Sequence, residues 1–254
     1  MIRNRFAALT AAVVVLPPVH AMFSYQIGGA FTPARGVGIV DRDRHARPAA
    51  GLYNVCYVNA FQAQAGGLGW WRAHHRGLLL FRHGRPVVDR HWDEQLLDTS
   101  TAGKRRALAK VIGSWFVGCA RRGVRAIEPD NLDSWTRSEG ALTVRDNLAL
   151  AALLIHRAHQ LGLAIAQKNA AELAATGRGL GFDFAIAEQC QPYAQCGSYM
   201  RAYGREMIEI EYPDNGGLPG SEAACRARGA LISIVYRDRD VTPAGQPGYV
   251  ERWC

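Results

Sequence analysis

The sequence predicts an α/β protein that folds as a single (β/α)8 (TIM) barrel. Short apolar runs rich in β-branched residues alternate with helical patterns at intervals of roughly 20–30 residues, about eight times in succession. Residues 22–254 number 233, close to the length of about 250 that such a barrel takes. A doubly wound sheet is the alternative, but it favours a glycine-rich phosphate loop after the first strand. Gly28-Gly29 and Gly36-x-Gly38 do not have that spacing.

The N-terminus has the pattern of a secretory signal peptide. Arg3 and Arg5 precede an apolar run over residues 6–16, and the small residue Ala21 ends the segment. A helix that spans a bilayer needs about 20 apolar residues, so this run is too short to be one. We therefore predict a signal peptide over residues 1–21, cleavage after Ala21 and one barrel domain over residues 22–254. The protein is then secreted and extracellular, with no stable membrane association.

Periodicity places the helices and strands in order. In the helix predicted over residues 101–120, Leu108, Ile112 and Phe116 recur on one face. The helix predicted over residues 147–161 ends at Gly162, a typical C-cap residue. Further helices are expected at residues 169–175, 195–203 and 221–228. The expected strands cover residues 23–27, 36–40, 52–58, 78–81 together with 87–88, 124–127, 163–167, 182–187, 207–210 and 231–235.

The cysteine count fits an exported protein. Six cysteines in an oxidising compartment predict disulfides, and six allow fifteen pairings that spacing does not resolve. Cys190 and Cys196 are close enough in sequence to staple one loop, and a disulfide at Cys254 would fix the C-terminus. A zinc site is disfavoured because no C-x-x-C or clustered Cys/His spacing occurs.

The charges are distributed unevenly. The net charge is +8, and +6 once Arg3 and Arg5 are removed with the leader, but the cations are scattered over predicted helix faces. Carboxylates instead follow most of the predicted strands, and in a barrel those positions share the face where active sites lie. Strand 163–167 departs from this pattern, since Lys168 and Asn169 follow it. An acidic site argues against a nucleic-acid or phosphate ligand and for a neutral or cationic one.

The tract from Val124 to Asp133 is the most informative of these strand ends. A short apolar strand breaks into Glu128-Pro-Asp130-Asn131-Leu-Asp133, and charge at the end of a core strand is costly unless it is paired. A polar loop with a helix-capping aspartate is the alternative interpretation. For Asp41 and Asp238, capping or pairing with a nearby arginine is as good an explanation as binding.

Paired carboxylates together with aromatic and amide side chains are typical of glycoside hydrolysis. In that reaction one acid attacks the sugar or activates water, while the other donates a proton to the leaving oxygen. The G-x-S-x-G, H-E-x-x-H and phosphate-loop motifs of other enzyme classes do not occur. The side chains that could bind a sugar are Tyr25, Tyr53, Tyr57, Asn59, Gln62, Gln64, Trp70, Trp71, Trp135 and Tyr212.

Several motifs in order along the chain resemble one known family. They are Tyr53-x-x-Cys-Tyr-Val-Asn59, Glu128-Pro-Asp-Asn-Leu-Asp133, Gln167-Lys-Asn169, Gly181-Phe-Asp-Phe184 running to Glu188-x-Cys190, and Glu211-Tyr212. The chain after Ala21 thereby resembles glycoside hydrolase family 114, the endo-α-1,4-polygalactosaminidase-like proteins with a (β/α)8 barrel. The resemblance implies retaining hydrolysis of α-1,4-linked galactosamine or N-acetylgalactosamine polysaccharide, without a metal or organic cofactor. It implies that Asp130 is the nucleophile and Glu188 the acid/base.

We expect the polysaccharide to be held by a wider set of side chains near these two acids. Lys168 is expected to pair with one of the acids, lowering its pKa and keeping it ionised. Acidic residues at the rim would attract a polymer with free amines. The expected substrate-binding residues are Asp41, Tyr53, Tyr57, Asn59, Asn131, Asp133, Lys168, Glu211, Tyr212 and Asp238.

Two other functions remain open at the level of the sequence. One is a non-catalytic polysaccharide-binding barrel, and the other is a metal-dependent phosphodiesterase on the same fold that uses Asp and His residues. We expect a monomer, because no long unpaired apolar stripe is visible, and no nucleic-acid partner.

Overall fold

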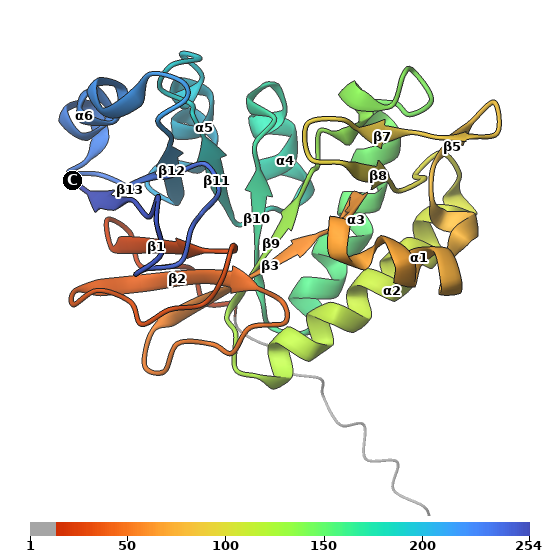
Figure 1. Ribbon diagram of the computed structural model, residues 1–254, viewed down its shortest axis with the longest axis horizontal. Helices are drawn as coiled ribbons and strands as arrows, with labels where there is room; N and C mark the ends of the chain where they lie inside the picture. The colour runs from red at the N-terminus through yellow and green to blue at the C-terminus, as the bar shows by residue number, and fades with distance from the viewer. Residues whose placement is uncertain (1–13) are drawn as a thin grey trace, which may run out of the picture.

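The computed structural model describes residues 14–254, so most of the predicted signal peptide lies outside the described residues. The predicted α/β barrel is confirmed. Eight strands follow one another in sequence order, each parallel to the next (Figure 1). They are β1 (Met22–Gln26), β2 (Val37–Asp43), β3 (Tyr53–Asn59), β9 (Ala126–Asp130), β10 (Ala164–Lys168), β11 (Phe184–Glu188), β12 (Met207–Glu211) and β13 (Ser233–Arg237).

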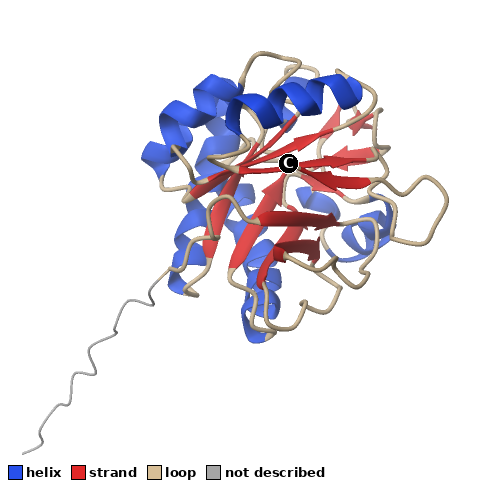
Figure 2. Ribbon diagram, turned by 90° about the vertical axis from the view of Figure 1, so that its left-hand side faces the viewer, coloured by secondary structure: helices blue, strands red, loops and turns tan. Residues whose placement is uncertain are grey.

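Helices cover the outside of the barrel unevenly. Within residues 14–254 there are six α-helices: α1 (Leu68–His74), α2 (Ala102–Arg121), α3 (Val144–Gln160), α4 (Ala174–Leu180), α5 (Cys196–Tyr203) and α6 (Gly217–Arg228). From β9 onwards a helix follows each strand as far as β13, as the βα repeat requires. Loops replace helices between β1 and β2 and between β2 and β3, so this side of the barrel carries no helix (Figures 1 and 2).

The segment between β3 and α2 is an excursion from the barrel rather than part of its wall. It contains a small antiparallel sheet of β4 (Gln62–Ala63), β8 (Glu94–Leu96) and β7 (Val88–Asp89), and a hairpin of β5 (Phe81–Arg82) and β6 (Arg85–Pro86). The expected barrel strand over 78–81 and 87–88 is therefore wrong. Its apolar runs are too short to cross a barrel, and His83-Gly84, both with positive φ, turn the chain back on itself.

Alternation along the strands sorts their side chains into two cores. Phe23, Ile39, Val55, Ala126 and Ile210 belong to a cluster inside the barrel, while the residues between them pack outward against the helices. Because the side-chain period of a strand is two, positions in step with the inner cluster also face inward at the carboxyl ends. This register decides which acidic residues can reach the site.

The barrel closes without a backbone ladder between β1 and β13. A ninth strand, β14 (Glu251–Trp253), pairs antiparallel with β13 and supplies side chains that bond to β1 instead. Glu251 accepts hydrogen bonds from the Ser24 hydroxyl at 2.8 Å and the Tyr25 amide at 3.2 Å, and Trp253 Nε1 donates to the Phe23 carbonyl at 2.8 Å. The exposed edge of β1 is thus satisfied by side chains of the C-terminal segment.

Three disulfides pair all six cysteines. They join Cys56 to Cys119, Cys190 to Cys196, and Cys225 to Cys254. The expected staple at Cys190–Cys196 and the expected anchor at Cys254 are both present, and three disulfides fit an extracellular protein. A search of residues 14–254 finds no helix that is both long and apolar enough to cross a membrane.

The Cys225–Cys254 disulfide ties the segment that seals the barrel to α6. Replacing both cysteines by alanine should lower the free energy of unfolding by about 3–4 kcal/mol, the loop-closure value for this sequence separation. The matched control replaces Cys190 and Cys196, whose short loop predicts a loss of about 2 kcal/mol. Denaturant unfolding of the two double variants measures both losses. If the Cys225/Cys254 variant lost less stability than the Cys190/Cys196 variant, the closure between β1 and β13 would not depend on the Cys225–Cys254 disulfide.

Candidate active site

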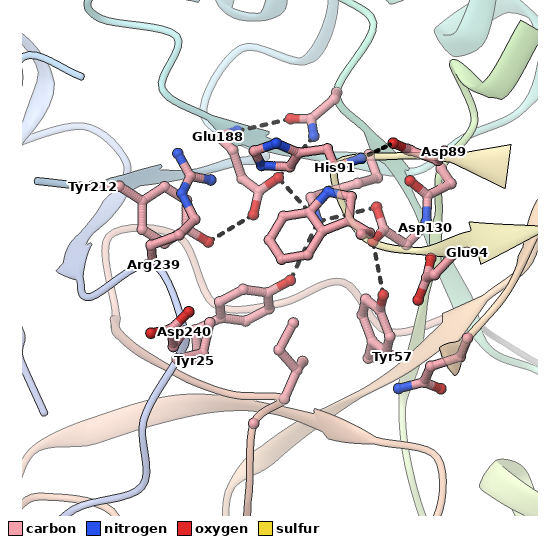
Figure 3. A pocket seen from close by; sticks show the side chains of 18 of the residues that line it. Tyr25, Tyr57, Asp89, His91, Glu94, Asp130, Glu188, Tyr212, Arg239 and Asp240 are labelled. Atoms are coloured by element: carbon pink, nitrogen blue, oxygen red, sulfur yellow. Dashed lines mark hydrogen bonds and ion pairs between the residues drawn. The ribbon is translucent and has the colours of Figure 1, made fainter. Parts of the chain in front are cut away.

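A cleft of about 490 Å³ opens at the carboxyl ends of the barrel strands. Inward-facing residues from β1, β3, β9, β10 and β11 reach it, together with the excursion after β3 and the loop after β13 (Figure 3). It is lined by Tyr25, Ile27, Gly28, Tyr57, Gln64, Asp89, His91, Trp92, Glu94, Asp130, Asn131, Asp133, Arg137, Lys168, Asn169, Glu188, Tyr212, Arg239, Asp240 and Val241.

The Lys168 ammonium group lies at the centre of the cleft floor. Its side chain is 2% exposed, and its Nζ lies 2.6 Å from Glu128 Oε1, 3.2 Å from Asp130 Oδ1 and 3.4 Å from Glu188 Oε2. Burial alone would lower the pKa of Lys168, but the surrounding carboxylates raise it well above its usual value, so the amine is charged. The expected pairing of Lys168 with an acid is confirmed, and it extends to three acids.

The carboxylate of Asp130 is held ionised. Burial raises its pKa, but the charge of Lys168 and hydrogen bonds from the Tyr57 hydroxyl, the Asn131 backbone and Lys168 outweigh burial and lower it. The Tyr57 hydroxyl donates to Oδ2 at 2.8 Å while Lys168 donates to Oδ1. A carboxylate that is charged at neutral pH and exposed to the cleft is chemically able to act as a nucleophile.

The carboxyl group of Glu188 is fixed by two neighbours. The Tyr212 hydroxyl donates to Oε1 at 2.7 Å, and Asn169 Nδ2 donates to Oε2 at 2.9 Å. Asn169 Oδ1 in turn accepts the Glu188 backbone N–H at 2.9 Å, so the two residues clamp each other. This arrangement aims the carboxyl group at the same space as Asp130 (Figure 3).

The backbone turns sharply where three of these strands end. Asn131, Asn169 and Gln189, which follow β9, β10 and β11, all have a left-handed conformation with φ of 67°, 51° and 54°. Asparagine tolerates this region better than most residues, which explains why two of the three positions are asparagine. The turn returns the side chains of Asn131 and Asn169 to the cleft that the strand has just reached.

The two candidate catalytic carboxylates are close together. Because Asp130 Oδ1 and Glu188 Oε2 lie 3.2 and 3.4 Å from one nitrogen, these two oxygens are at most about 6.6 Å apart. Retaining glycosidases hold their carboxyl groups at about 5–5.5 Å and inverting ones at about 6.5–9.5 Å. The upper bound of about 6.6 Å between Asp130 Oδ1 and Glu188 Oε2 lies at the lower limit of the inverting range, so nearly all of that range is excluded for these two oxygens.

The excursion after β3 forms an aromatic wall of the cleft. Trp92 is 48% exposed although it lines the cleft, and the His91 ring contacts it edge-on at 4.9 Å between ring centroids. Asp89 holds this wall: it accepts the His91 backbone N–H at 3.0 Å and pairs with Arg137 at 2.7 Å. Sequence reasoning missed both aromatic residues. The feature of the sequence that could have indicated them is a tryptophan between two acids, Asp89 and Asp93.

The cleft is acidic in a chain of positive net charge. Six acidic residues line it against three basic ones, and each of the three cations is paired. Lys168 pairs with the acids described above, Arg137 with Asp89 and Asp133, and Arg239 with Asp214 at 2.7 Å. The acidic residues are Asp89, Glu94, Asp130, Asp133, Glu188 and Asp240. The lining therefore favours a cationic or neutral ligand.

The described residues include one cluster with metal-ligand spacing outside the cleft: Cys190, Cys196 and Glu209. The two sulfur atoms form a disulfide, so they are not thiolate ligands.

A family model described as Glycoside-hydrolase family GH114 matches residues 3–254. The chain is similar to Ega3 of Aspergillus fumigatus, solved in complex with galactosamine, at 20% identity and a TM-score of 0.75, covering 95% of this chain and 98% of that one. It is also similar to the glycoside hydrolase domain of PelA from Pseudomonas aeruginosa, at 16% identity and a TM-score of 0.60, covering 89% and 96%. A search of curated proteins gives no match. At these identities the two structures show a shared fold.

Most of the residues expected from the sequence meet in the cleft. Its lining contains both expected catalytic acids and Tyr57, Asn131, Asp133, Lys168 and Tyr212. Asn59 lies just behind it, donating to Glu94 at 2.7 Å and accepting from Asn131 at 3.0 Å, and so supports residues of the lining.

Four expected substrate-binding residues are not part of the lining of the cleft, and their assignment is corrected. Tyr53 starts β3 at the opposite end of the barrel, where its hydroxyl donates to the Val15 carbonyl. Asp238 pairs with Arg237 and accepts the amides of Thr242 and Val250. Asp41 faces inward but is fully buried and does not line the cleft. The fourth residue is Glu211.

Glu211 faces out of the barrel, because it is out of step with the inward-facing Ile210 and Tyr212. Its neighbour on that face is Glu209, whose carboxylate forms two hydrogen bonds with Arg228 at 2.8 and 2.9 Å. Burial, and then the charge of Glu209, raise the pKa of Glu211 to about 8, although a hydrogen bond from the Gln191 amide opposes this. Glu211 is thus a buried structural acid.

The raised pKa of Glu211 predicts a pH-dependent stability. Protonated Glu211 contributes fully below its unfolded pKa of about 4.3, and this contribution is lost as the pH rises toward and through 8. The glutamine in Glu211→Gln does not titrate. The melting temperature of this variant minus that of the wild type should therefore increase as the pH rises from 5 to 9. The exposed Glu222→Gln on α6 is the control and should show a constant difference. A constant difference for both variants would show that Glu211 is ionised throughout.

Proposed function

The chain belongs to glycoside-hydrolase family GH114, and we propose that it is a secreted, retaining enzyme that cleaves α-1,4-linked galactosamine-containing polysaccharide. The observation that carries the proposal is the shared contact of Asp130 and Glu188 with the Lys168 ammonium group at the floor of one cleft. Inverting enzymes need a wider gap to hold a water molecule between the two carboxyl groups. A short separation instead favours a covalent mechanism, in which one carboxylate attacks the sugar directly.

In the first step, the Asp130 carboxylate attacks the anomeric carbon while Glu188 gives its proton to the glycosidic oxygen. The carbon–oxygen bond to the leaving sugar breaks, and a glycosyl ester forms on Asp130. In the second step, Glu188 takes a proton from water, whose oxygen attacks the anomeric carbon and releases the Asp130 carboxylate. Two inversions restore the original anomeric configuration.

The neighbours of each acid suit its role. Lys168 and the Tyr57 hydroxyl lower the energy of the charged Asp130 carboxylate, which must be present before attack and leave again in the second step. Tyr212 and Asn169 orient Glu188, so that it can address the leaving oxygen first and the incoming water afterwards.

The charge of the lining supports a substrate with free amines. A galactosamine unit without its acetyl group carries an ammonium, which the excess of carboxylates in the cleft would attract. At a Debye length of about 8 Å in physiological salt, these local charges outweigh the positive charge of the distant surface. The similar Ega3 structure contains galactosamine, which agrees with this substrate class.

Export is part of the proposal. β1 begins at Met22, immediately after the predicted cleavage site, so cleavage there would leave the strand whole. The three disulfides require an oxidising compartment to form.

Removing either acid should abolish turnover of partly deacetylated α-1,4-galactosaminan, measured as release of reducing ends. Asp130→Asn should lose at least about a thousandfold in kcat, because the ester cannot form. Glu188→Gln should lose about 10²–10⁴-fold, the usual contribution of a general acid. Glu222→Gln on α6 is the control. Activity that survives Asp130→Asn would assign the nucleophile elsewhere, and binding without cleavage by the wild type would favour a polysaccharide-binding barrel.

The aromatic wall should contribute to binding more than to chemistry. Trp92→Ala should raise KM for the polymer about tenfold, which corresponds to about 1.4 kcal/mol, and leave kcat within about twofold. Trp70→Ala is a matched control, since Trp70 is similarly exposed at 40% but lies on α1 outside the cleft lining. Equal KM values for Trp92→Ala and the wild type would remove Trp92 from the substrate site.

A further inference from the structure

Two acidic side chains lie beneath the catalytic floor. Asp41 on β2 and Glu128 on β9 face the barrel interior, and both are 0% exposed. Glu128 is one inward position below Asp130 on the same strand, and its Oε1 accepts hydrogen bonds from Lys168 at 2.6 Å and from the Tyr25 hydroxyl at 3.1 Å. Neither acid belongs to the lining of the cleft.

The hydrogen bonds of this pair are incomplete if both groups are ionised. Both oxygens of Asp41 and Oε2 of Glu128 are buried, and they have no donor among the hydrogen bonds of residues 14–254. Buried carboxylates without donors are strongly disfavoured, and because the charge of Glu128 acts on Asp41, two ionised groups here would repel each other. A proton between the two groups would provide the missing donor and remove the repulsion.

We propose that Asp41 is a protonated acid that donates a hydrogen bond to Glu128 and thereby positions Lys168 between Asp130 and Glu188. Asp41 and Glu128 then carry one negative charge together, which the Lys168 ammonium neutralises. Asp41 touches neither substrate nor reacting atoms, so it is a positioning residue. This role deepens the proposed function, and the state of the proton can be tested without any substrate.

The charge balance explains why the proton matters for catalysis. With Asp41 neutral, Lys168 keeps contact with the floor through Glu128 and still reaches Asp130 and Glu188 at 3.2 and 3.4 Å. A second negative charge on the floor would draw the ammonium group down and weaken its contacts with both catalytic acids. Loss of the Asp41 proton therefore predicts an alkaline limit of activity.

The surroundings of Asp41 favour the neutral acid. Burial, and then the charge of Glu128, raise the pKa of Asp41 well above its usual value, and the charge of Lys168 opposes the shift. The titratable groups that face the pair from neighbouring strands are Tyr25 on β1, Tyr57 on β3, Asp130 on β9 and Lys168 on β10.

The sign of the pH effect follows from linkage. The stabilising contribution of protonated Asp41 is fully present below its unfolded pKa of about 3.9, and it is lost as the pH rises through the higher folded pKa. Asp41→Asn keeps the size of the side chain and an N–H donor for Glu128 but cannot lose a proton. The melting temperature of Asp41→Asn minus that of the wild type should therefore increase as the pH rises from 5 to 9.

Infrared difference spectroscopy of the full chain tests the proton directly. The wild type minus Asp41→Asn spectrum at pH 7 should contain the carbonyl band of a protonated carboxylic acid. The wild type minus Glu222→Gln spectrum, in which an exposed glutamate on α6 is replaced, is the control and should lack this carbonyl band. Carboxylate bands at Asp41, or a melting-temperature difference that does not change with pH, would overturn the proposal, whatever the substrate of the enzyme.

Activity tests the positioning role. Asp41→Ala should lower kcat at least tenfold with KM within about twofold, and Asp41→Asn should restore most of that loss. The alkaline limb of the kcat profile should move to higher pH in Asp41→Asn. It should not move in Glu211→Gln, which removes a buried acid on the outer face of the barrel. Loss of kcat in Asp41→Asn equal to that in Asp41→Ala would show that Asp41 acts as a carboxylate.

Discussion

The structure of the site depends on one buried cation. The Lys168 ammonium group lies in the barrel interior within 3.4 Å of three carboxylates, which would otherwise repel one another there. A buried lysine on its own would lose its proton, and buried carboxylates on their own would gain one. The carboxylates raise the pKa of Lys168, and the charge of Lys168 in turn lowers the pKa of Asp130, so this lysine and this aspartate keep each other charged. The arrangement places the negative charge of Asp130 at the floor of the cleft.

The fold supplies the precision of that pairing through strand register. Lys168, Asp130 and Glu188 end three successive strands, β10, β9 and β11, at inward-facing positions. A shift of one residue in any of these strands would turn its functional side chain toward the helices. Between β1 and β13, where the barrel has no backbone pairing, the side chains of β14 hold the two strands in register. The Cys225–Cys254 disulfide in turn anchors the end of β14 to α6.

Much of this could be predicted from the sequence, and the exceptions have physical causes. The alternation of strands and helices predicted the barrel, and the acids at strand ends predicted the face that carries the cleft. Strand ends alone do not reveal which side of the wall a residue faces. Glu211 and Glu128 look alike in sequence, but one packs against helices and the other lies under Lys168. Trp92 was missed because it belongs to an excursion whose course depends on contacts such as Asp89 with Arg137.

In the proposed mechanism Asp130 forms a covalent bond with the sugar, and trapping that intermediate tests the mechanism most directly. Glu188→Gln should accumulate the glycosyl ester when it is given a galactosaminide with a good leaving group, because the second step lacks its base. Peptide mass spectrometry should then find one added glycosyl unit on residues 126–137, the segment between Arg125 and Arg137 that contains Asp130. An adduct on another segment, or a first product with inverted anomeric configuration, would contradict the mechanism.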